Sequence, residues 1–201
     1  MPLRVLKLEG AGGIEFEPKL TFKRNAIDGL AVGAVTKLTL QFRSRFWPVR
    51  NFGFIHAEDA SLPTWWSDQR GLVLTGWAGG PLAERLNREP EEELVARGIR
   101  TLSSLFKVEP QQVQENLVGS HTHNWSTDPF ARGGYSYTPV RMGKMTAVLA
   151  EPLAGTVFFA GEATDSDGEQ GTVHAALASG RRAASAILAA TRTGARLGLA
   201  A

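Results

Sequence analysis

The chain has 201 residues, of which 43% are hydrophobic and 21% charged, a composition typical of a folded domain and not of a disordered or fibrous protein. Basic residues number 22 and acidic residues 20, so the net charge of +2 gives no reason to expect nucleic acid or an anionic membrane as the main partner. Cysteine is absent, which excludes disulfides, thiolate metal sites and thioether-linked cofactors. No apolar run reaches the ~18 residues of a membrane span, and the charged N-terminal stretch does not resemble a signal peptide. A chain without cysteine suits either redox environment, so composition leaves the compartment open. We expect no membrane span and a cytoplasmic location.

Two hydrophobic patterns predict the secondary structure. Apolar and polar residues alternate at 35–42, as in a strand with one buried face, whereas Val95, Ile99, Leu102 and Phe106 recur at helical spacing. Elsewhere the evidence is shorter apolar runs bounded by glycine, proline or asparagine. The expected elements are strands at 3–8, 14–17, 35–42, 51–56, 71–77, 117–125 and 156–160, and helices between Pro18 and Gly33, at 91–106 and at 171–190.

The last expected helix has a face made of small and apolar residues, which predicts that it packs very close to its neighbour. The residues of this face are Val173, Leu177, Gly180, Ala184 and Ile187. After about residue 191 the chain is expected to be a frayed tail.

A buried strand followed by a loop and a helix N-terminus is the strongest local signal. The run 156–160 ends in Gly161-Glu162, and Gly171-Thr172 opens the last helix. Glycine allows a ligand to approach the backbone, a carboxylate can accept hydrogen bonds from sugar-type hydroxyls, and a helix N-terminus favours an electron-rich ring edge or an anion. On spacing alone, an ordinary strand–loop–helix with an exposed Glu162 is an equally good interpretation.

Three stretches of the chain together resemble a known family. Residues 125–137 (WSTDPFARGGYSY), 158–162 (FFAGE) and 171–180 (GTVHAALASG) look like the C-terminal third of the flavin-dependent amine oxidases. That family includes the monoamine and polyamine oxidases, the L-amino-acid oxidases and the lysine-specific histone demethylases. The resemblance extends back to Pro2–Lys7, which is similar to the strand that ends in the family's active-site lysine, and covers residues 2–190 with its weakest part at 57–115.

The resemblance implies an α+β fold, in which a substrate lobe with a mixed sheet is joined to the C-terminal strand and helix of a Rossmann-like FAD lobe. The implied organisation is the end of the FAD lobe with the active-site strand at 1–13, the substrate-binding lobe at 14–120, the C-terminal FAD-binding segment at 121–190 and the tail at 191–201.

The resemblance also implies how the cofactor is held. Glu162 would bond the ribityl chain or nearby hydroxyls, its neighbours would give backbone access to the phosphate side, and the start of the last helix would present N–H groups to the N1/C2=O edge of the flavin. Gly134 stands where some members attach flavin through cysteine, so FAD is expected to bind non-covalently. The implied cofactor-binding residues are Trp125, Gly161, Glu162, Ala163, Gly171, Thr172 and Val173.

For the substrate, the resemblance implies that Tyr135 forms one wall of an aromatic cage for an amine, with Thr172 where monoamine oxidases place a second tyrosine. Lys7 would hold the water that bridges to flavin N5. The implied reaction passes a hydride from the carbon next to the amine nitrogen to the flavin, which O₂ reoxidises with formation of H₂O₂.

The family's N-terminal dinucleotide-binding turn, G-x-G-x-x-G, has no credible match. Residues 10–15 come nearest, but Glu15 replaces the third glycine and Pro18 prevents the helix that must follow. We therefore expect a missing N-terminal FAD-binding half as a partner. Two alternatives stay open: a non-catalytic remnant or interaction module that does not bind FAD alone, and a related flavin fold such as a desaturase or protoporphyrinogen oxidase.

The remaining polar and aromatic clusters predict no further site. His121 and His123 lie on one face of an expected strand, but no third ligand is evident, so we expect no metal. Trp65, Trp66 and Trp77 are expected to fill the core of the substrate lobe.

Overall fold

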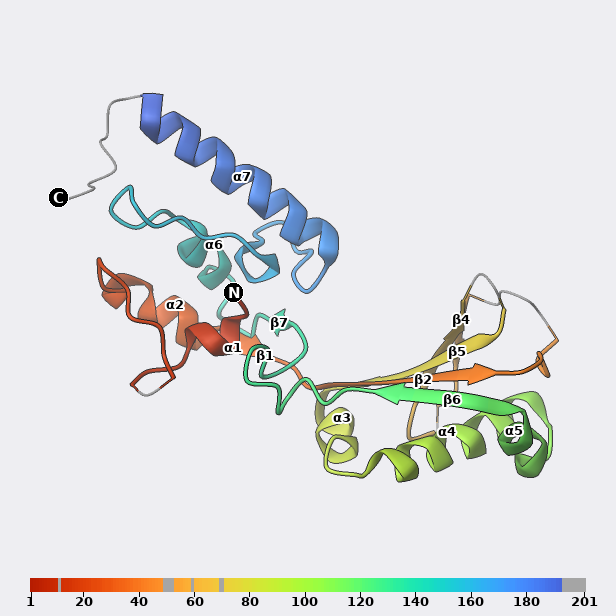
Figure 1. Ribbon diagram of the computed structural model, residues 1–201. Coiled ribbons are helices and arrows are strands. Elements are labelled where there is room, and N and C mark those ends of the chain that lie inside the picture. Colours follow the sequence, from red (N-terminus) through yellow and green to blue (C-terminus); the bar gives the residue numbers. More distant parts are fainter. Residues whose placement is uncertain (11, 49–52, 59, 69–70, 193–201) are drawn as a thin grey trace. The chain divides into compact units, whose positions relative to one another are not determined.

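The computed structural model describes residues 1–192 except 11, 49–52, 59 and 69–70 (Figure 1). The chain divides into two compact units: unit 1 is formed by Met1–Gly33 with Asp128–Ala201, and unit 2 by Ala34–Thr127. Helices and antiparallel sheet are combined in the fold, which confirms the expected α+β class.

Unit 2 is built on a five-stranded antiparallel sheet with the order β3-β4-β5-β2-β6. Strand β2, which lies between β5 and β6, alternates buried and exposed residues as expected from the sequence, since one face is packed and the other is not. Leu38 of β2 pairs with Gly76 of β5 and with Thr122 of β6. The strands are β2 (Val35–Phe42), β3 (Phe54–His56), β4 (Thr64–Ser67), β5 (Val73–Gly79) and β6 (Leu117–Thr122).

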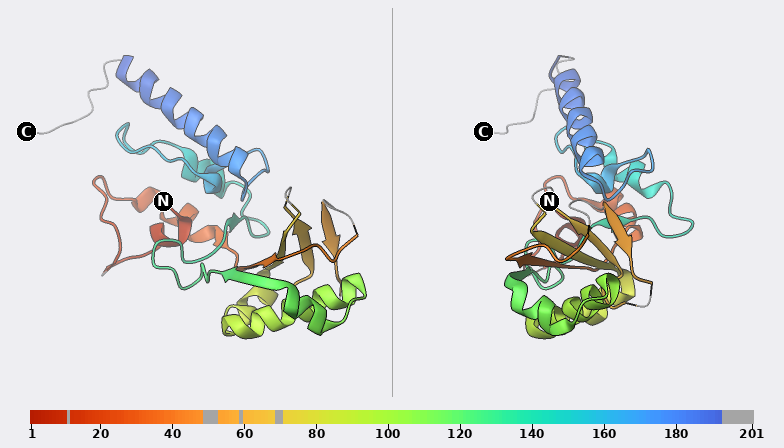
Figure 2. Two further views of the ribbon diagram at one scale, coloured as in Figure 1. Left: turned by 45° about the vertical axis from the view of Figure 1, so that its right-hand side comes forward. Right: turned by 90° about the vertical axis from the view of Figure 1, so that its right-hand side faces the viewer.

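Three helices cover one face of this sheet, as both views of Figure 2 show. They are α3 (Gly80–Leu86), α4 (Glu91–Phe106) and α5 (Pro110–Asn116), and α4 has the bounds predicted from its periodicity. A Cβ placed on Gly98 of α4 would lie 2.7 Å from Leu38 Cδ2, so the absence of a side chain lets the helix pack directly on β2. The buried core between helices and sheet includes Leu38, Leu40, Phe42, Trp65, Leu74, Ile99 and Leu102.

The tryptophans of unit 2 separate onto both faces of the sheet. Trp65 is fully buried and donates its indole N–H to the Leu62 carbonyl at 2.7 Å. Trp66 and Trp77 are only partly buried and lie on the opposite face, because neighbouring residues of a strand alternate in direction. The expectation that all three fill the core is therefore wrong for Trp66 and Trp77.

Unit 1 consists of short elements from both ends of the chain. The small sheet pairs β1 with β7 in antiparallel register, Ala31 opposite Tyr137 and Val32 opposite Ser136. The described elements are α1 (Leu3–Leu6), the 3₁₀ turn η1 (Thr21–Lys23), α2 (Arg24–Gly29), β1 (Ala31–Val32), β7 (Ser136–Tyr137), α6 (Met145–Ala150), the 3₁₀ turn η2 (Glu162–Thr164) and α7 (Val173–Arg192).

Two cations hold the C-terminal end of α6. The ammonium of Lys23, only 4% exposed, donates to the carbonyls of Val148 and Glu151 at 2.5 Å. The Arg182 guanidinium of α7 donates to the Ala150 carbonyl at 2.9 Å. Cations at this position satisfy carbonyls that have no partner within the helix and complement its negative end.

The apolar face of α7 is largely exposed. Ala175, Ser179 and Ala183 are its buried residues, whereas Val173 is 77% and Leu177 63% exposed. The face expected from the sequence to pack closely is thus not covered by the part of the chain that the structure describes. Figure 1 shows α7 as the long helix of unit 1.

Several predicted elements differ from the structure. Residues 3–6 form helix α1 and not a strand, because Leu3 and Leu6, one turn apart, are both buried. Residues 14–17 form no strand, and 156–160 contribute only an isolated bridge, Val157 opposite Leu153. The helix expected between Pro18 and Gly33 is shorter, and the strand expected at 117–125 ends at Thr122. Residues 51 and 52 of another expected strand lie outside the described residues.

Among the described residues no helix is long and apolar enough to cross a membrane. Nor does that part of the chain contain a cluster of three or more histidine or acidic residues arranged to hold a metal ion. His121 and His123 lie on β6 or just after it, and no third ligand joins them there.

Candidate flavin and amine site

Tyr135 lies just before β7 and is positioned by the small sheet of unit 1. Its carbonyl accepts a hydrogen bond from the Gly33 N–H at 3.0 Å, directly after β1. Its ring packs against the backbone of Gly171, since a Cβ on that glycine would lie 3.2 Å from Tyr135 Cδ2. Gly171 also has φ = +83°, a conformation that other residues rarely adopt. Burial raises the pKa of the Tyr135 phenol above its ordinary value, although 42% of the residue is exposed.

The Glu162 carboxylate is hydrogen-bonded both to β7 and to the start of α7. Its Oε2 accepts from the Ser136 hydroxyl and from the Gly171 N–H, both at 2.7 Å, and its Oε1 accepts from the Ser136 N–H at 3.1 Å. An ionised carboxylate offers about four acceptor positions. Oε1 therefore keeps capacity for a further donor, such as a ligand hydroxyl.

Gly161, which precedes this carboxylate, has a backbone that suits close approach of a ligand. Its φ is +132°, and no atom lies within 4 Å of the position that a Cβ would take. Its N–H donates to the Ser179 hydroxyl of α7 at 2.8 Å, which fixes the loop to the helix. Ala163 follows within η2 and packs against the core of unit 1.

The N-terminal turn of α7 is capped by Thr172. The Thr172 hydroxyl donates to the Glu169 carbonyl at 2.6 Å and accepts from the Ala175 N–H at 3.3 Å. Val173, the first residue of the helix, is largely exposed. The first N–H groups of a helix have no partner within it, so this turn suits an anion or an electron-rich ring edge.

Lys7 ends α1 and is bonded to the end of α2. Its Nζ donates to the carbonyls of Leu30 at 2.5 Å and Asp28 at 3.2 Å. Burial lowers the pKa of this ammonium below its ordinary value; the Asp28 carboxylate opposes that shift, and Arg4 and Arg24 add to it. In this structure the ammonium is thus tied to backbone carbonyls next to β1.

The structure brings together one set of expected residues within unit 1. This set contains Tyr135, Gly161, Glu162, Ala163, Gly171, Thr172 and Val173. Lys7 belongs to the same unit, and Trp125 belongs to unit 2, where its ring meets His123 edge to face at 4.4 Å.

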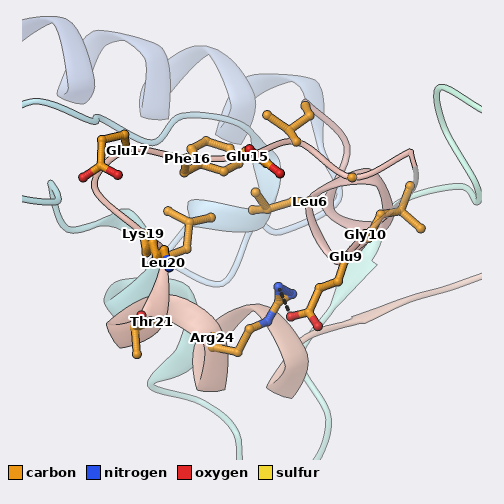
Figure 3. A pocket seen from close by; sticks show the side chains of 13 residues that line it. Leu6, Glu9, Gly10, Glu15, Phe16, Glu17, Lys19, Leu20, Thr21 and Arg24 are labelled. Atoms are coloured by element: carbon orange, nitrogen blue, oxygen red, sulfur yellow. Dashed lines mark ion pairs between the residues drawn. The ribbon is translucent and has the colours of Figure 1, made fainter.

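A cavity of about 650 Å³ in unit 1 contains none of the expected site residues. Apolar side chains such as Leu6, Phe16 and Leu20 line it together with carboxylates, and Figure 3 shows Glu9 and Arg24 directed toward one another as an ion pair at 3.0 Å. Its lining combines both charges, so its chemistry favours no single class of ligand.

Sequence reasoning missed three polar residues of this site, Ser136, Gln170 and Ser179. Ser136 is 3% and Ser179 4% exposed, and both hydroxyls bond to groups more than 17 residues away in the chain. Serine and glutamine occur throughout surface loops, so no pattern in the sequence indicates such distant partners. Only their places in the sequence, directly next to Tyr135, Gly171 and Gly180, indicated that these three residues could belong to the site.

The Glu162 carboxylate thus bonds both to Ser136 of β7 and to Gly171 before α7, and the Tyr135 ring lies against that glycine. The family model of flavin-containing amine oxidoreductases matches residues 1–188, and the chain belongs to that family.

Similar proteins include demethylases and an oxidase. "Lysine-specific histone demethylase 1 homolog 1" of Oryza sativa subsp. japonica is 34% identical over 96% of this chain, and "Lysine-specific histone demethylase 2" of Homo sapiens is 32% identical over 94%. "Probable polyamine oxidase 4" of Arabidopsis thaliana is 32% identical over 90%. The chain spans only 23%, 24% and 35% of the lengths of these three relatives.

Proposed function

We propose that this chain forms the C-terminal part of an FAD-dependent amine oxidase, in which it supplies the substrate lobe and the last segment of the cofactor site. One observation carries the proposal: the Tyr135 ring packs on Gly171 where α7 begins, and the Glu162 carboxylate bonds to both sides of this junction, Ser136 and Gly171. A residue proposed for the amine thus lies beside residues proposed for the flavin.

The residues of this junction fit a non-covalently bound flavin. Glu162 Oε1 retains acceptor capacity for a ribityl hydroxyl, Gly161 leaves open space above its backbone, and the first turn of α7 offers N–H groups at Thr172 and Val173. FAD would supply the electron-accepting ring that oxidises the amine and passes the electrons to O₂. The chain's own groups hold and orient the cofactor, and the positive end of α7 favours negative charge on the ring.

For the amine, we propose that Tyr135 and Thr172 flank the substrate nitrogen, and that unit 2 belongs to the substrate lobe. The sheet face opposite α3, α4 and α5 supports the second part, because Phe54 and Trp66 lie there with ring centroids 5.7 Å apart and Trp77 is only partly buried. Aromatic faces attract ammonium groups. Trp125 is proposed to pack near the flavin ring.

Lys7 is proposed to organise a water next to the flavin. A lysine whose pKa is lowered by burial gives up its proton at a lower pH than an ordinary lysine. In the flavin-loaded protein Lys7→Met should slow flavin reduction and reoxidation more than it weakens amine binding, as stopped-flow spectroscopy can measure. Unchanged rates would contradict this role.

The N-terminal FAD-binding half is the proposed partner, and the exposed apolar face of α7 is the surface that we propose it covers. This face includes Val173, Leu177 and Ile187. Without the dinucleotide-binding turn, the chain keeps ring and ribityl contacts but lacks the charge-assisted bonds to the pyrophosphate. We therefore expect the chain alone to bind FAD weakly; its cytoplasmic location stays a prediction.

Complementation tests the proposal. The chain is joined to the N-terminal FAD-binding segment of a related amine oxidase, and flavin retention after dialysis is measured together with amine-dependent H₂O₂ release. Retained flavin and peroxide formation with a polyamine or a methylated lysine peptide are the expected results. A complemented protein that stays colourless would favour the alternative, a non-catalytic interaction module.

Glu162→Ala in this complemented protein should lower FAD affinity roughly 10- to 150-fold, since a hydrogen bond to a charged group contributes about 1.5–3 kcal/mol. Glu84→Ala is a suitable control, because it removes an exposed carboxylate of α3 in unit 2, away from the junction in unit 1. Equal affinities of the two variants would remove Glu162 from the cofactor site.

A further inference from the structure

The polar residues around Glu162 form a single directed chain of hydrogen bonds. The Thr138 hydroxyl donates to Gln170 Oε1 at 2.6 Å, Gln170 Nε2 donates to the Ser136 hydroxyl oxygen at 2.7 Å, and that hydroxyl donates to Glu162 Oε2 at 2.7 Å. Each donor and acceptor is used in its proper sense, and every bond is directed toward the carboxylate. Networks of this kind are rigid when every member is satisfied.

At Ser136 the chain of hydrogen bonds reaches the backbone of β7. Its side chain is 3% exposed and points toward Glu162, and Ser136 N–H donates to the same carboxylate. Tyr135 directly precedes Ser136, and its own carbonyl is bonded to the Gly33 N–H. Holding Ser136 against Glu162 therefore restrains the backbone that carries the Tyr135 ring.

Gln170 makes the corresponding hydrogen bonds from the loop that precedes α7. It directly precedes Gly171, whose N–H bonds to Glu162 and whose backbone contacts the Tyr135 ring. Its amide bridges Ser136 to Thr138, one residue before and one residue after Tyr137. Two side-chain hydrogen bonds of Gln170 thereby connect the loop before α7 to β7 and to the residue that follows it.

We propose that Ser136 and Gln170 are positioning residues of the amine site, which hold the Tyr135 ring against Gly171 at the N-terminus of α7. This inference rests on the proposed function for the role of Tyr135, but the positioning itself is a property of the chain. Neither residue touches the amine; each acts through Glu162, Gly171 and Tyr135.

The chain itself allows a direct test, because it contains only two tyrosines, Tyr135 and Tyr137. Ring-labelled tyrosine gives NMR signals for both, which Tyr137→Phe assigns. In Ser136→Ala and in Gln170→Ala the Tyr135 ring signals should move toward their unfolded positions, and the Gly171 N–H should exchange with solvent about tenfold faster, as expected for the loss of one buried hydrogen bond. The indole N–H signals of the tryptophans, which all lie in unit 2, should stay in place.

Two further variants complete the test. Ser136→Thr keeps the hydroxyl and should restore both readouts. Ser166→Ala removes an exposed hydroxyl that bonds to its neighbour Asp167 and takes no part in this network, and it should change neither. Wild-type Tyr135 signals and Gly171 exchange in both Ser136→Ala and Gln170→Ala would overturn the proposal. So would equal changes throughout unit 2, since they indicate a general loss of structure.

The complemented protein separates this inference from the proposed function. With spermine as the amine probe and FAD added at saturation, so that every variant is fully loaded, Ser136→Ala should raise KM about tenfold. If the wild-type complemented protein neither retains flavin nor oxidises amines, the proposed function fails, whereas the NMR result on the chain still decides whether Ser136 and Gln170 position Tyr135. An unchanged KM in an active protein would overturn the role in the amine site.

Discussion

The two units of the chain are stabilised in different ways. Unit 2 has one continuous segment, a five-stranded sheet and a core of large apolar side chains such as Trp65 and Leu38. Unit 1 combines both chain ends, has few paired strands, and is tied by side chains that bond to distant backbone groups, among them Lys7, Lys23 and Arg182.

The large apolar core and the proposed functional site therefore lie mainly in different units. Apolar burial is non-directional and tolerates a range of sequences, whereas a cation on a carbonyl or a carboxylate on an N–H fixes one geometry. The proposed flavin and amine residues lie mainly in the unit that depends on directional bonds. That unit also exposes the apolar face of α7, so we expect it to be the less stable of the two.

A core deletion in unit 2 should have the largest effect. Leu38→Ala removes a fully buried side chain packed against α4 and should lower the free energy of unfolding of unit 2 by about 2–5 kcal/mol. All five tryptophans of the chain lie in unit 2, so their fluorescence in urea reports this unit alone. Thr39→Ala, on the open face of the same strand, is the control. A parallel loss of the tyrosine NMR signals of unit 1 would show that the units do not unfold separately.

Hydrogen exchange compares the units without any substitution. Amides of β2, β5 and α4 should exchange at least about 100-fold more slowly than those of α7, since only one side of α7 is packed. The measurement is exchange followed by NMR or mass spectrometry under native conditions. Slow and uniform protection across 173–192 in a monomer would mean that unit 1 is self-sufficient.

The directional bonds of unit 1 can be tested at Lys23. Lys23→Met keeps the length of the side chain but leaves the Val148 and Glu151 carbonyls without their charged donor. We expect a loss of about 1.5–3 kcal/mol in the stability of unit 1, read from the tyrosine signals in urea. Lys19→Met, at an exposed position, should have no effect, and an equal stability of both variants would contradict the importance of the α6 cap.

The smallest effect concerns alkaline pH. Because burial raises the pKa of Tyr135, the folded unit holds the phenol proton more tightly than the unfolded chain, and stability falls as the pH rises above about 10. The partly exposed ring limits this loss to below about 1 kcal/mol. Lys7, whose pKa burial lowers, has the opposite influence: stability rises as the pH approaches the ordinary lysine pKa of about 10.4.

Two variants separate these influences. Tyr135→Phe should abolish the alkaline loss of unit 1 stability, and Lys7→Met should reduce the opposing gain, to which Lys23 also contributes because burial lowers its pKa too. Urea midpoints measured from about pH 8.5 to 11 follow both. The same alkaline slope in Tyr135→Phe and the wild type would place the titrating group elsewhere.

Sequence patterns predicted unit 2 better than unit 1 for a physical reason. The alternation along β2 and the spacing along α4 reflect burial against one continuous core, and both elements have the expected bounds. Residues 3–6 contain apolar residues that suit either a strand or one helical turn, and tertiary packing of Leu3 and Leu6 selects the helix. A strand at 156–160 requires a partner, and within the described residues only Leu153 pairs with this segment.

The candidate site was predictable where a motif brought residues together along the chain, as in Gly161-Glu162 and Gly171-Thr172. The bonds from Glu162 to Ser136 and from Gly161 to Ser179 were not, because their partners are backbone groups or common polar side chains far apart in sequence. Trp66 and Trp77 show the same limit, since hydrophobicity does not indicate which face of a sheet is covered.

The pairing of Leu38 with Thr122 has a consequence for how the chain is assembled. Strands β2 and β6 are the first and last of unit 2, and paired residues of neighbouring antiparallel strands lie roughly 5 Å apart at their Cα atoms. Along the chain, unit 2 is therefore an insertion between the two segments of unit 1, and the two ends of this insertion lie next to one another. Its entropic cost of closure is that of a short hairpin and not of a long loop. Such an insertion can be excised or exchanged between related chains without stretching the unit that receives it.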